Sequence, residues 1–209
     1  MTEIRNVIFD LGGVVLEWNP DQILSRFQPD PDLRIRLRAD LFGPDWRLFD
    51  RGSLTEPELI GRLQARIGLT RAELIAIVDA VRESLVEKPD TVRLVRALHR
   101  RGIPLYCLSN MPASIYAHLR RRHAFWDVFR GIVISGEVRM AKPEPEVFTH
   151  LLQRFDLRAG ETVFVDDLGI NIDAARAAGL RTVWFRDATQ CQRELEQWIP
   201  LTGCKDELP

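Results

Sequence analysis

The chain has 209 residues, of which 45% are hydrophobic and 28% are charged. This is the composition of a globular protein, and it excludes disordered, collagen-like and coiled-coil classes. The 29 Lys and Arg residues balance 30 Asp and Glu residues, which leaves a formal net charge of -1. Such a balance lacks the positive potential that nucleic acid or a membrane surface attracts, so we expect neither as a partner.

The cysteines and the two ends of the chain favour a cytoplasmic protein. The cysteines are odd in number and form no C-x-x-C pair, so we expect neither a disulfide framework nor a zinc site: Cys107, Cys191 and Cys204. The apolar run near the N-terminus is too short for a signal peptide, and no stretch approaches the roughly 20 apolar residues of a membrane helix. Residues 205–208 read KDEL, but Pro209 follows them, so we do not expect retention in the endoplasmic reticulum.

Five short apolar runs, each ending on polar residues, predict buried parallel strands. In chain order they are NVIFD ending at Asp10, IPLYCLSN at Ser109 and Asn110, GIVISG near Ser135, TVFVDD at Asp166 and Asp167, and TVWFRD at Asp187.

Helical patterns alternate with these strands. Asp90 is expected to cap one helix that stops before Gly102, and Pro143 is expected to open another that reaches about Phe155. Alternating strands and helices predict an α/β fold with a doubly wound parallel Rossmann-like sheet, helices on both faces and ligands at the carboxyl ends of the strands.

Residues 18–88 break the alternation, because they carry helical patterns and no convincing strand. Apolar residues recur at helical spacing in three stretches, which we expect to be core: Leu33, Leu37 and Leu41; Leu59, Leu63 and Ile67; Leu74, Ile77, Val78 and Val81. We therefore predict a catalytic core from residues 1–17 and 89–209, interrupted by a helical insert at 18–88.

Carboxylates end two of the predicted strands. Asp10 precedes Gly12 and Gly13, so its side chain would project into a pocket that a ligand can approach closely, although Asp and Gly also form plain turns. Asp166 and Asp167 would repel each other at a partly buried strand end unless a cation neutralised them. Magnesium fits two carboxylates, although an exposed loop that caps the next helix would look the same.

Two further strand-end features suit an anion. Ser109 and Asn110 precede Met111 and Pro112, so their hydroxyl and backbone N–H groups could face an anion, although Ser and Asn also cap helices that bind nothing. Lysine occurs only at positions 88, 142 and 205. Lys142 offers a compact charge that suits a single phosphate oxygen beside a carboxylate.

Taken in order, these motifs resemble the haloacid dehalogenase-like hydrolase superfamily, in which most members are magnesium-dependent phosphatases. The resemblance spans essentially the whole chain. It implies that Asp10 is the nucleophile, Ser109 binds phosphate, Lys142 is the charge clamp, and Asp166 and Asp167 hold the metal. The insert resembles the small helical cap of this family. FDLGGV, FDRGSLTEPEL and VDDLGINIDAA look most like bacterial sugar-phosphate phosphatases of the α-D-glucose-1-phosphate phosphatase type.

One departure from the family pattern concerns the general acid. Most phosphatases of this family carry a second Asp two residues after the nucleophile, where this chain has Gly12. The backbone carbonyl of Gly12 can still bind magnesium, but proton delivery to the leaving oxygen, typically worth roughly 10²–10⁴-fold in rate, is lost. The leaving group then departs unassisted, another group from the insert or a water donates the proton, or turnover is slow or absent.

These features predict a Mg²⁺-dependent phosphatase that acts on a small phosphorylated metabolite, with a sugar phosphate favoured, through an aspartyl-phosphate. Trp18, Trp46 and Arg51 in the insert, together with Asn110, are candidate substrate contacts, and Phe49 and Asp50 stand beside them. For each of these insert residues, core packing or solvent exposure weighs at least as much. We expect a monomer or a homodimer.

Two other functions remain open. A haloacid dehalogenase would use Asp10 and Lys142 and need neither metal nor general acid, and a phosphate-binding or partner-binding domain would have lost turnover. A phosphonatase would need a lysine in the insert between Trp18 and Glu87, and there is none.

Overall fold

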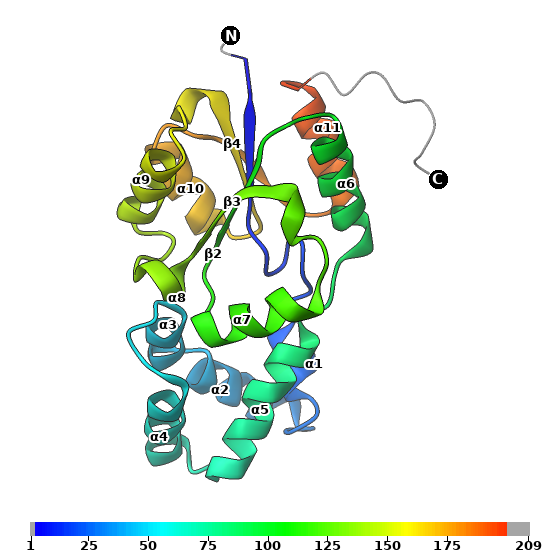
Figure 1. Ribbon diagram of the computed structural model, residues 1–209. Helices are drawn as coiled ribbons and strands as arrows, with labels where there is room; N and C mark the ends of the chain where they lie inside the picture. Colours follow the sequence, from blue (N-terminus) through cyan, green and yellow to red (C-terminus); the bar gives the residue numbers. More distant parts are fainter. Residues whose placement is uncertain (1–2, 200–209) are drawn as a thin grey trace.

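A computed structural model describes residues 3–199. Five parallel strands form one sheet in the order β3-β2-β1-β4-β5 (Figure 1). Their bounds are β1 Asn6–Phe9, β2 Leu105–Ser109, β3 Phe129–Ile134, β4 Thr162–Asp166 and β5 Arg181–Trp184. The chain order changes direction at β1, which places the carboxyl ends of β1, β2 and β4 side by side. The predicted α/β fold is confirmed.

Alternate residues of the strands pack into two separate cores. Ile8 and Phe164 face one side, where α9 (Pro145–Arg154) and α10 (Gly169–Ala177) cover the sheet. Phe9 and Val165 face the other, where α6 (Pro89–Arg100) and α11 (Ala188–Glu196) lie. Because both faces are covered, the central strands β1, β2 and β4 are mostly apolar and buried, as the sequence runs indicated, whereas the edge strands β3 and β5 also carry Arg130 and Arg181.

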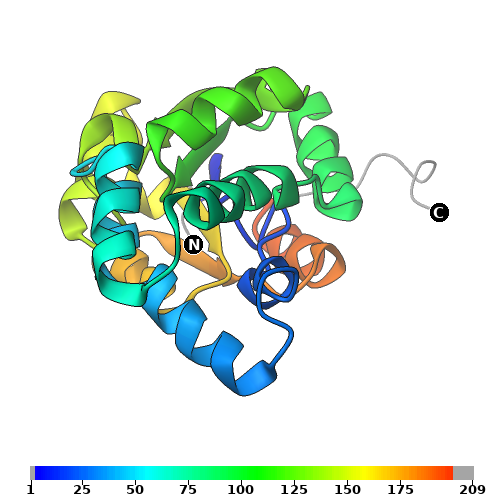
Figure 2. The ribbon, with the colours of Figure 1, turned by 90° about the horizontal axis from the view of Figure 1, so that it is seen from below.

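The helical insert lies at the carboxyl end of the sheet (Figures 1 and 2). Its helices are α1 Pro20–Leu24, α2 Pro31–Leu41, α3 Pro44–Asp50, α4 Glu56–Ile67 and α5 Arg71–Ser84. Capping boxes start α4 at Thr55 and α5 at Thr70, where each threonine exchanges hydrogen bonds with a glutamate three residues later. The two helices therefore begin at defined residues, and their apolar faces are buried.

The remaining short elements connect the core. They are α7 Ala113–Arg122, α8 Ser135–Val138, and the 3₁₀ turns η1 Trp126–Val128 and η2 Ala159–Glu161. Among the residues described, no helix combines the length and the apolar character that crossing a membrane demands. Cys107 and Cys191 are buried free thiols, whereas Cys204 and the KDEL segment lie outside the described residues.

Three predicted boundaries are wrong. Lys88, not Asp90, is the N-cap of α6, because Pro89 takes the first helical position that proline favours. For the same reason α9 begins at Pro145 rather than at Pro143. Strand β5 ends at Trp184, and Asp187 instead caps α11 by accepting a hydrogen bond from the Gln190 N–H.

One predicted core stripe is partly wrong. In α2 Leu41 is buried, but Leu33 is 48% exposed, and Leu37 is only partly buried. Arginines interrupt this helix at positions 34, 36 and 38, so its apolar face is too narrow to bury the whole stripe. The stripes on α4 and α5 are buried apart from Ile67, which packs partly buried against the same core.

Candidate active site

Three side chains from different parts of the sequence meet at the carboxyl edge of the sheet. Asp10 follows β1, Asp166 ends β4, and Lys142 comes from the loop before α9. Lys142 Nζ lies 2.8 Å from Asp10 Oδ1 and 2.7 Å from Asp166 Oδ2. All three side chains are buried. Together with Asp167 they form the floor of the candidate site.

Asn110 fixes the position of Lys142. Its amide nitrogen donates to the Lys142 carbonyl, and its amide oxygen accepts from the Lys142 N–H, each at 2.8 Å. The side chain of Asn110 is therefore occupied by the protein, which leaves its backbone N–H and the buried Ser109 at the end of β2 as the groups from this strand that can face an anion. The Asn110 side chain thus positions Lys142, and the contact of the Asn110 backbone N–H with an anion stays a prediction.

Asp166 is held by more donors than Lys142 alone. The Leu168 N–H donates to Asp166 Oδ1 at 2.8 Å, and the Asn171 amide donates to both oxygens at 3.0 and 3.1 Å. A buried carboxylate needs such compensation, because water no longer solvates it. Asn171 was not predicted, although its place in the first turn of the helix after the Asp166-Asp167 pair is a readable signal.

Asp167 is fitted against the loop that follows β1. Gly13 has φ +79°, and a Cβ placed there would lie 2.3 Å from Asp167 Oδ2, so only glycine allows this approach. The carboxylates of Asp10, Asp166 and Asp167 each offer a ligand atom, and these atoms lie within 4.8 Å of one another. Hard oxygen donors gathered in this way suit magnesium.

In the floor, burial and neighbouring charges both shift the pKa values of the side chains. Burial raises the pKa of Asp10 to about 7, against the attraction of Lys142, and the neighbouring Asp166 adds to the rise. Burial and the charge of Asp166 also raise the pKa of Asp167. Burial alone would lower the pKa of Lys142, but the carboxylates of Asp10 and Asp166 outweigh it and raise that pKa. The floor therefore keeps a charged lysine and has an excess of carboxylates that a cation would relieve.

A turn of the insert forms a roof over this edge of the sheet. The roof is the segment 50–52, at the end of α3. Ser135 Oγ donates to the Asp50 carbonyl at 2.6 Å and accepts from the Met111 N–H at 2.9 Å. Gly52, at φ +77°, lies so close to the Gly136 carbonyl that a Cβ would approach it within 2.4 Å. The roof is thus docked on the ends of β2 and β3.

Arg51 also joins the roof to the loop of Lys142. Its guanidinium forms an ion pair with Glu144, whose other carboxylate oxygen accepts from the Ala141 N–H at 3.2 Å. The structure places the charge of Arg51 against Glu144, and the contact of Arg51 with substrate stays a prediction. Neither Glu144 nor Ser135 was predicted as a contact, since the sequence does not reveal which core residues the insert meets.

Aromatic side chains line the interior of the insert beside the floor. Gly12 lies against Trp18, Trp18 packs edge-on against Phe42 at 5.4 Å, and Phe42 packs against Trp46 at 4.8 Å between ring centroids. Trp46 is 5% exposed and belongs to the core, so its predicted contact with substrate is not supported. Trp18 is partly exposed beside Gly12 and remains a candidate.

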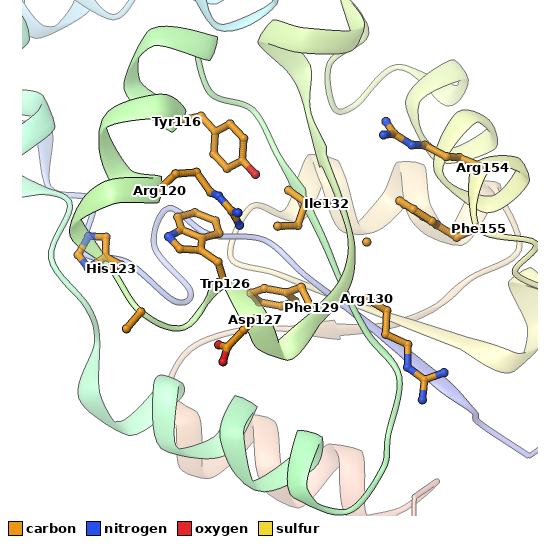
Figure 3. Close-up of a pocket in the computed structure, with 12 residues that line it drawn as sticks. Tyr116, Arg120, His123, Trp126, Asp127, Phe129, Arg130, Ile132, Arg154 and Phe155 are labelled. Carbon is orange, nitrogen blue, oxygen red and sulfur yellow. The ribbon is translucent and has the colours of Figure 1, made fainter.

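A separate groove of about 700 Å³ lies elsewhere, on the outer edge of the sheet (Figure 3). It runs along β3 between α7 and the end of α9, and Arg120, Arg130 and Arg154 surround its aromatic lining of Trp126 and Phe155. Arg120 and Arg154 stack over Trp126 and Phe155, respectively. None of the predicted site residues lines it.

Comparison with known proteins agrees with this geometry. Residues 4–179 match the haloacid dehalogenase-like hydrolase family. The sesquiterpene phosphatase astK of Aspergillus oryzae is 33% identical over 203 residues, which are 97% of this chain and 99% of that protein. The fructose-1-phosphate phosphatase YqaB of Escherichia coli is 27% identical over 86% of this chain and 95% of its own.

A solved structure has a similar fold over most of the chain. The haloacid dehalogenase family enzyme BT-2542 of Bacteroides thetaiotaomicron, in complex with magnesium and inorganic phosphate, has a TM-score of 0.71 and 25% identity over 88% of this chain and 94% of its own. The strand-end carboxylates, the buried lysine and these matches lead to one conclusion: the chain belongs to the haloacid dehalogenase-like hydrolases.

Proposed function

We propose that this protein is a Mg²⁺-dependent phosphatase that hydrolyses a small phosphate ester through an aspartyl-phosphate on Asp10. The observation that carries the proposal is how Asp10 is held. The Lys142 ammonium at 2.8 Å and the Leu11 N–H at 2.7 Å both bind Oδ1. Among the described residues no hydrogen bond or ion pair engages Oδ2, so the second oxygen is available to attack phosphorus.

The reaction follows from the placement of these groups. Asp10 Oδ2 attacks phosphorus, the bond from phosphorus to the ester oxygen breaks, and water then cleaves the aspartyl-phosphate. Ser109, the Asn110 N–H and Lys142 orient the phosphate and hold charge on its oxygens. Magnesium, held by Asp10, Asp166, Asp167 and the Gly12 carbonyl, would supply positive charge for the phosphate oxygens and the three carboxylates.

The substrate that we propose first is a sugar phosphate. It is supported by the sequence motifs shared with sugar-phosphate phosphatases and by the similarity to a fructose-1-phosphate phosphatase. A second candidate is a phosphate of an apolar alcohol. The aromatic series from Trp18 to Trp46 and the similarity to a sesquiterpene phosphatase favour it.

The other functions fit the floor less well. A dehalogenase has no use for three carboxylates whose ligand atoms gather within 4.8 Å, because it needs no cation. A binding domain has no use for a buried carboxylate with an oxygen left free beside a lysine. The assay described next can detect either of these functions.

A panel of phosphate esters tests the proposal, with release of inorganic phosphate measured with and without magnesium. We expect release that requires magnesium and that Asp10→Asn abolishes. Release that continues without a divalent ion, or that survives in Asp10→Asn, would contradict the proposal. Chloride release from a 2-haloacid would establish the dehalogenase instead.

A further inference from the structure

We propose that Asp50, in the roof, donates the proton to the leaving oxygen and so replaces the acid that is missing at Gly12. This inference rests on the proposed phosphatase function and adds a second catalytic carboxyl group to it, from the helical insert.

The position of Asp50 is fixed by contacts on both sides of the site. Its carbonyl accepts from Ser135 Oγ, which is bonded in turn to the Met111 N–H, two residues beyond Ser109. The next residue, Arg51, is paired with Glu144, two residues beyond Lys142. In the ribbon, α3 ends against α8 at the carboxyl edge of the sheet (Figure 1).

The geometry of phosphoryl transfer sends the leaving oxygen toward this roof. Asp10 attacks from the floor, and the attacking and leaving oxygens lie roughly in line across phosphorus. The leaving oxygen therefore emerges on the side away from the sheet, where the insert covers the site. Gly12, beside Asp10 on the floor, has no side chain with which to reach it.

The surroundings of Asp50 keep its carboxyl group suited to donation. Burial raises the pKa of Asp50 well above its ordinary value, and a hydrogen bond from the Trp46 side chain opposes the rise only in part. The residue nevertheless stays partly accessible to solvent. A raised pKa brings a carboxyl group closer to the protonated state that a general acid needs.

The other acidic side chains of the insert are less suitable. Those that the structure describes cap helices, pair with arginine or histidine, or are exposed. Asp45 pairs with Arg62 and Arg66, for example, and Asp79 with Arg82. Asp50 forms no ion pair among the described residues.

The proposed step balances. Asp10 Oδ2 forms a bond to phosphorus while the bond to the ester oxygen breaks, and that oxygen keeps the electron pair and takes the proton of Asp50. In the second half the Asp50 carboxylate accepts a proton from the water that attacks the aspartyl-phosphate. The sum is an ester plus water giving an alcohol plus phosphate, with Asp10 and Asp50 restored.

The test compares leaving groups in the full-length protein with magnesium. Substrates are p-nitrophenyl phosphate, whose leaving group needs no proton, and an alkyl phosphate, whose leaving group does. We expect Asp50→Asn to slow the alkyl ester by about 10²-fold and to change the nitrophenyl ester little. The ratio of the two rates within one preparation is independent of how much protein folds. Asp79→Asn, the same chemical change on the exposed face of the insert, should leave the ratio unchanged.

A rescue variant sharpens the result. A Cβ at Gly12 would lie 3.7 Å from Trp18, an ordinary contact, so Gly12→Asp added to Asp50→Asn should restore much of the lost alkyl-ester rate. An equal loss on both esters, or an unchanged ratio, would overturn the role of Asp50 and leave the phosphatase standing. Failure of the unmodified protein to release phosphate from either ester would overturn both.

Discussion

In the floor of the site Lys142 pairs with buried carboxylates, whereas in the roof the Asp50 carboxyl group has no ion-pair partner among the described residues. Lys142 lies between Asp10 and Asp166, and Asn171 supplies two further hydrogen bonds to Asp166. The Asp50 carboxyl group instead has a hydrogen bond with the Trp46 side chain. The carboxylates of the floor raise the pKa of Lys142 and keep it charged, whereas burial without a cationic partner raises the pKa of Asp50. The difference suits a floor that binds phosphate and metal and a roof that supplies a proton.

Removing the central cation of the floor should have the largest effect. Lys142→Met leaves the carboxylates of Asp10 and Asp166 without their ion-pair partner, and breaking a buried pair in this way costs about 3–5 kcal/mol. We expect a loss of this size in the free energy of unfolding, measured by denaturant without metal, and loss of turnover. A change below 1 kcal/mol would show that Lys142 does not organise the floor.

The two adjacent glycines offer a matched pair of variants. At Gly13 a Cβ collides with Asp167 Oδ2 in a positive-φ conformation, whereas at Gly12 it meets only Trp18 at 3.7 Å. Gly13→Ala should cost about 1–3 kcal/mol and weaken magnesium binding, which calorimetry measures, and Gly12→Ala should do neither. Similar magnesium affinities in the two variants would contradict the placement of Asp167.

Asp50→Asn, in the roof, should change how the free energy of unfolding of the protein depends on pH. The pKa of Asp50 is higher in the folded chain than its ordinary value of 3.8, so the folded chain holds this proton more tightly than the unfolded chain. The stability that this proton provides is full below the unfolded pKa and is lost as the pH rises through the folded pKa. Asn carries no such proton, so the variant should gain stability relative to the unmodified protein as the pH rises. A difference that is constant from pH 4 to pH 8 would show that Asp50 is not buried as an acid.

The smallest effect on stability is expected for the partly exposed ion pair that joins the roof to the loop of Lys142. Arg51 and Glu144 form an ion pair in which the side chains are 38% and 33% exposed, and such pairs contribute about 0–1 kcal/mol. Arg51→Ala should therefore unfold at nearly the same denaturant concentration as the unmodified protein. A loss of several kcal/mol would mean that the roof is held mainly by this pair and not by Ser135 and Gly136.

The sequence was enough to predict which residues meet in the floor, whereas for the roof it singled out Arg51 without showing what the roof contacts. Asp10, Ser109 and Asp166 stand where apolar strand patterns stop, and parallel strands bring such ends together, so their convergence follows from pattern alone. The order of the strands, the Asn110 clamp on Lys142 and the contact of Asp50 with Ser135 depend on packing between segments distant in the sequence. Local propensity does not specify such packing, and Leu33, placed in the core by its spacing, is exposed for the same reason.

The most direct test of the account is to find where phosphate becomes attached. A substrate turned over with magnesium and quenched in acid should leave a phosphorylated peptide that contains Asp10, detected by mass spectrometry, and none in Asp10→Asn. Asp50→Asn should still form this peptide from p-nitrophenyl phosphate. Phosphate found on another residue, or turnover without any phosphorylated protein, would contradict the central claim that Asp10 is the nucleophile.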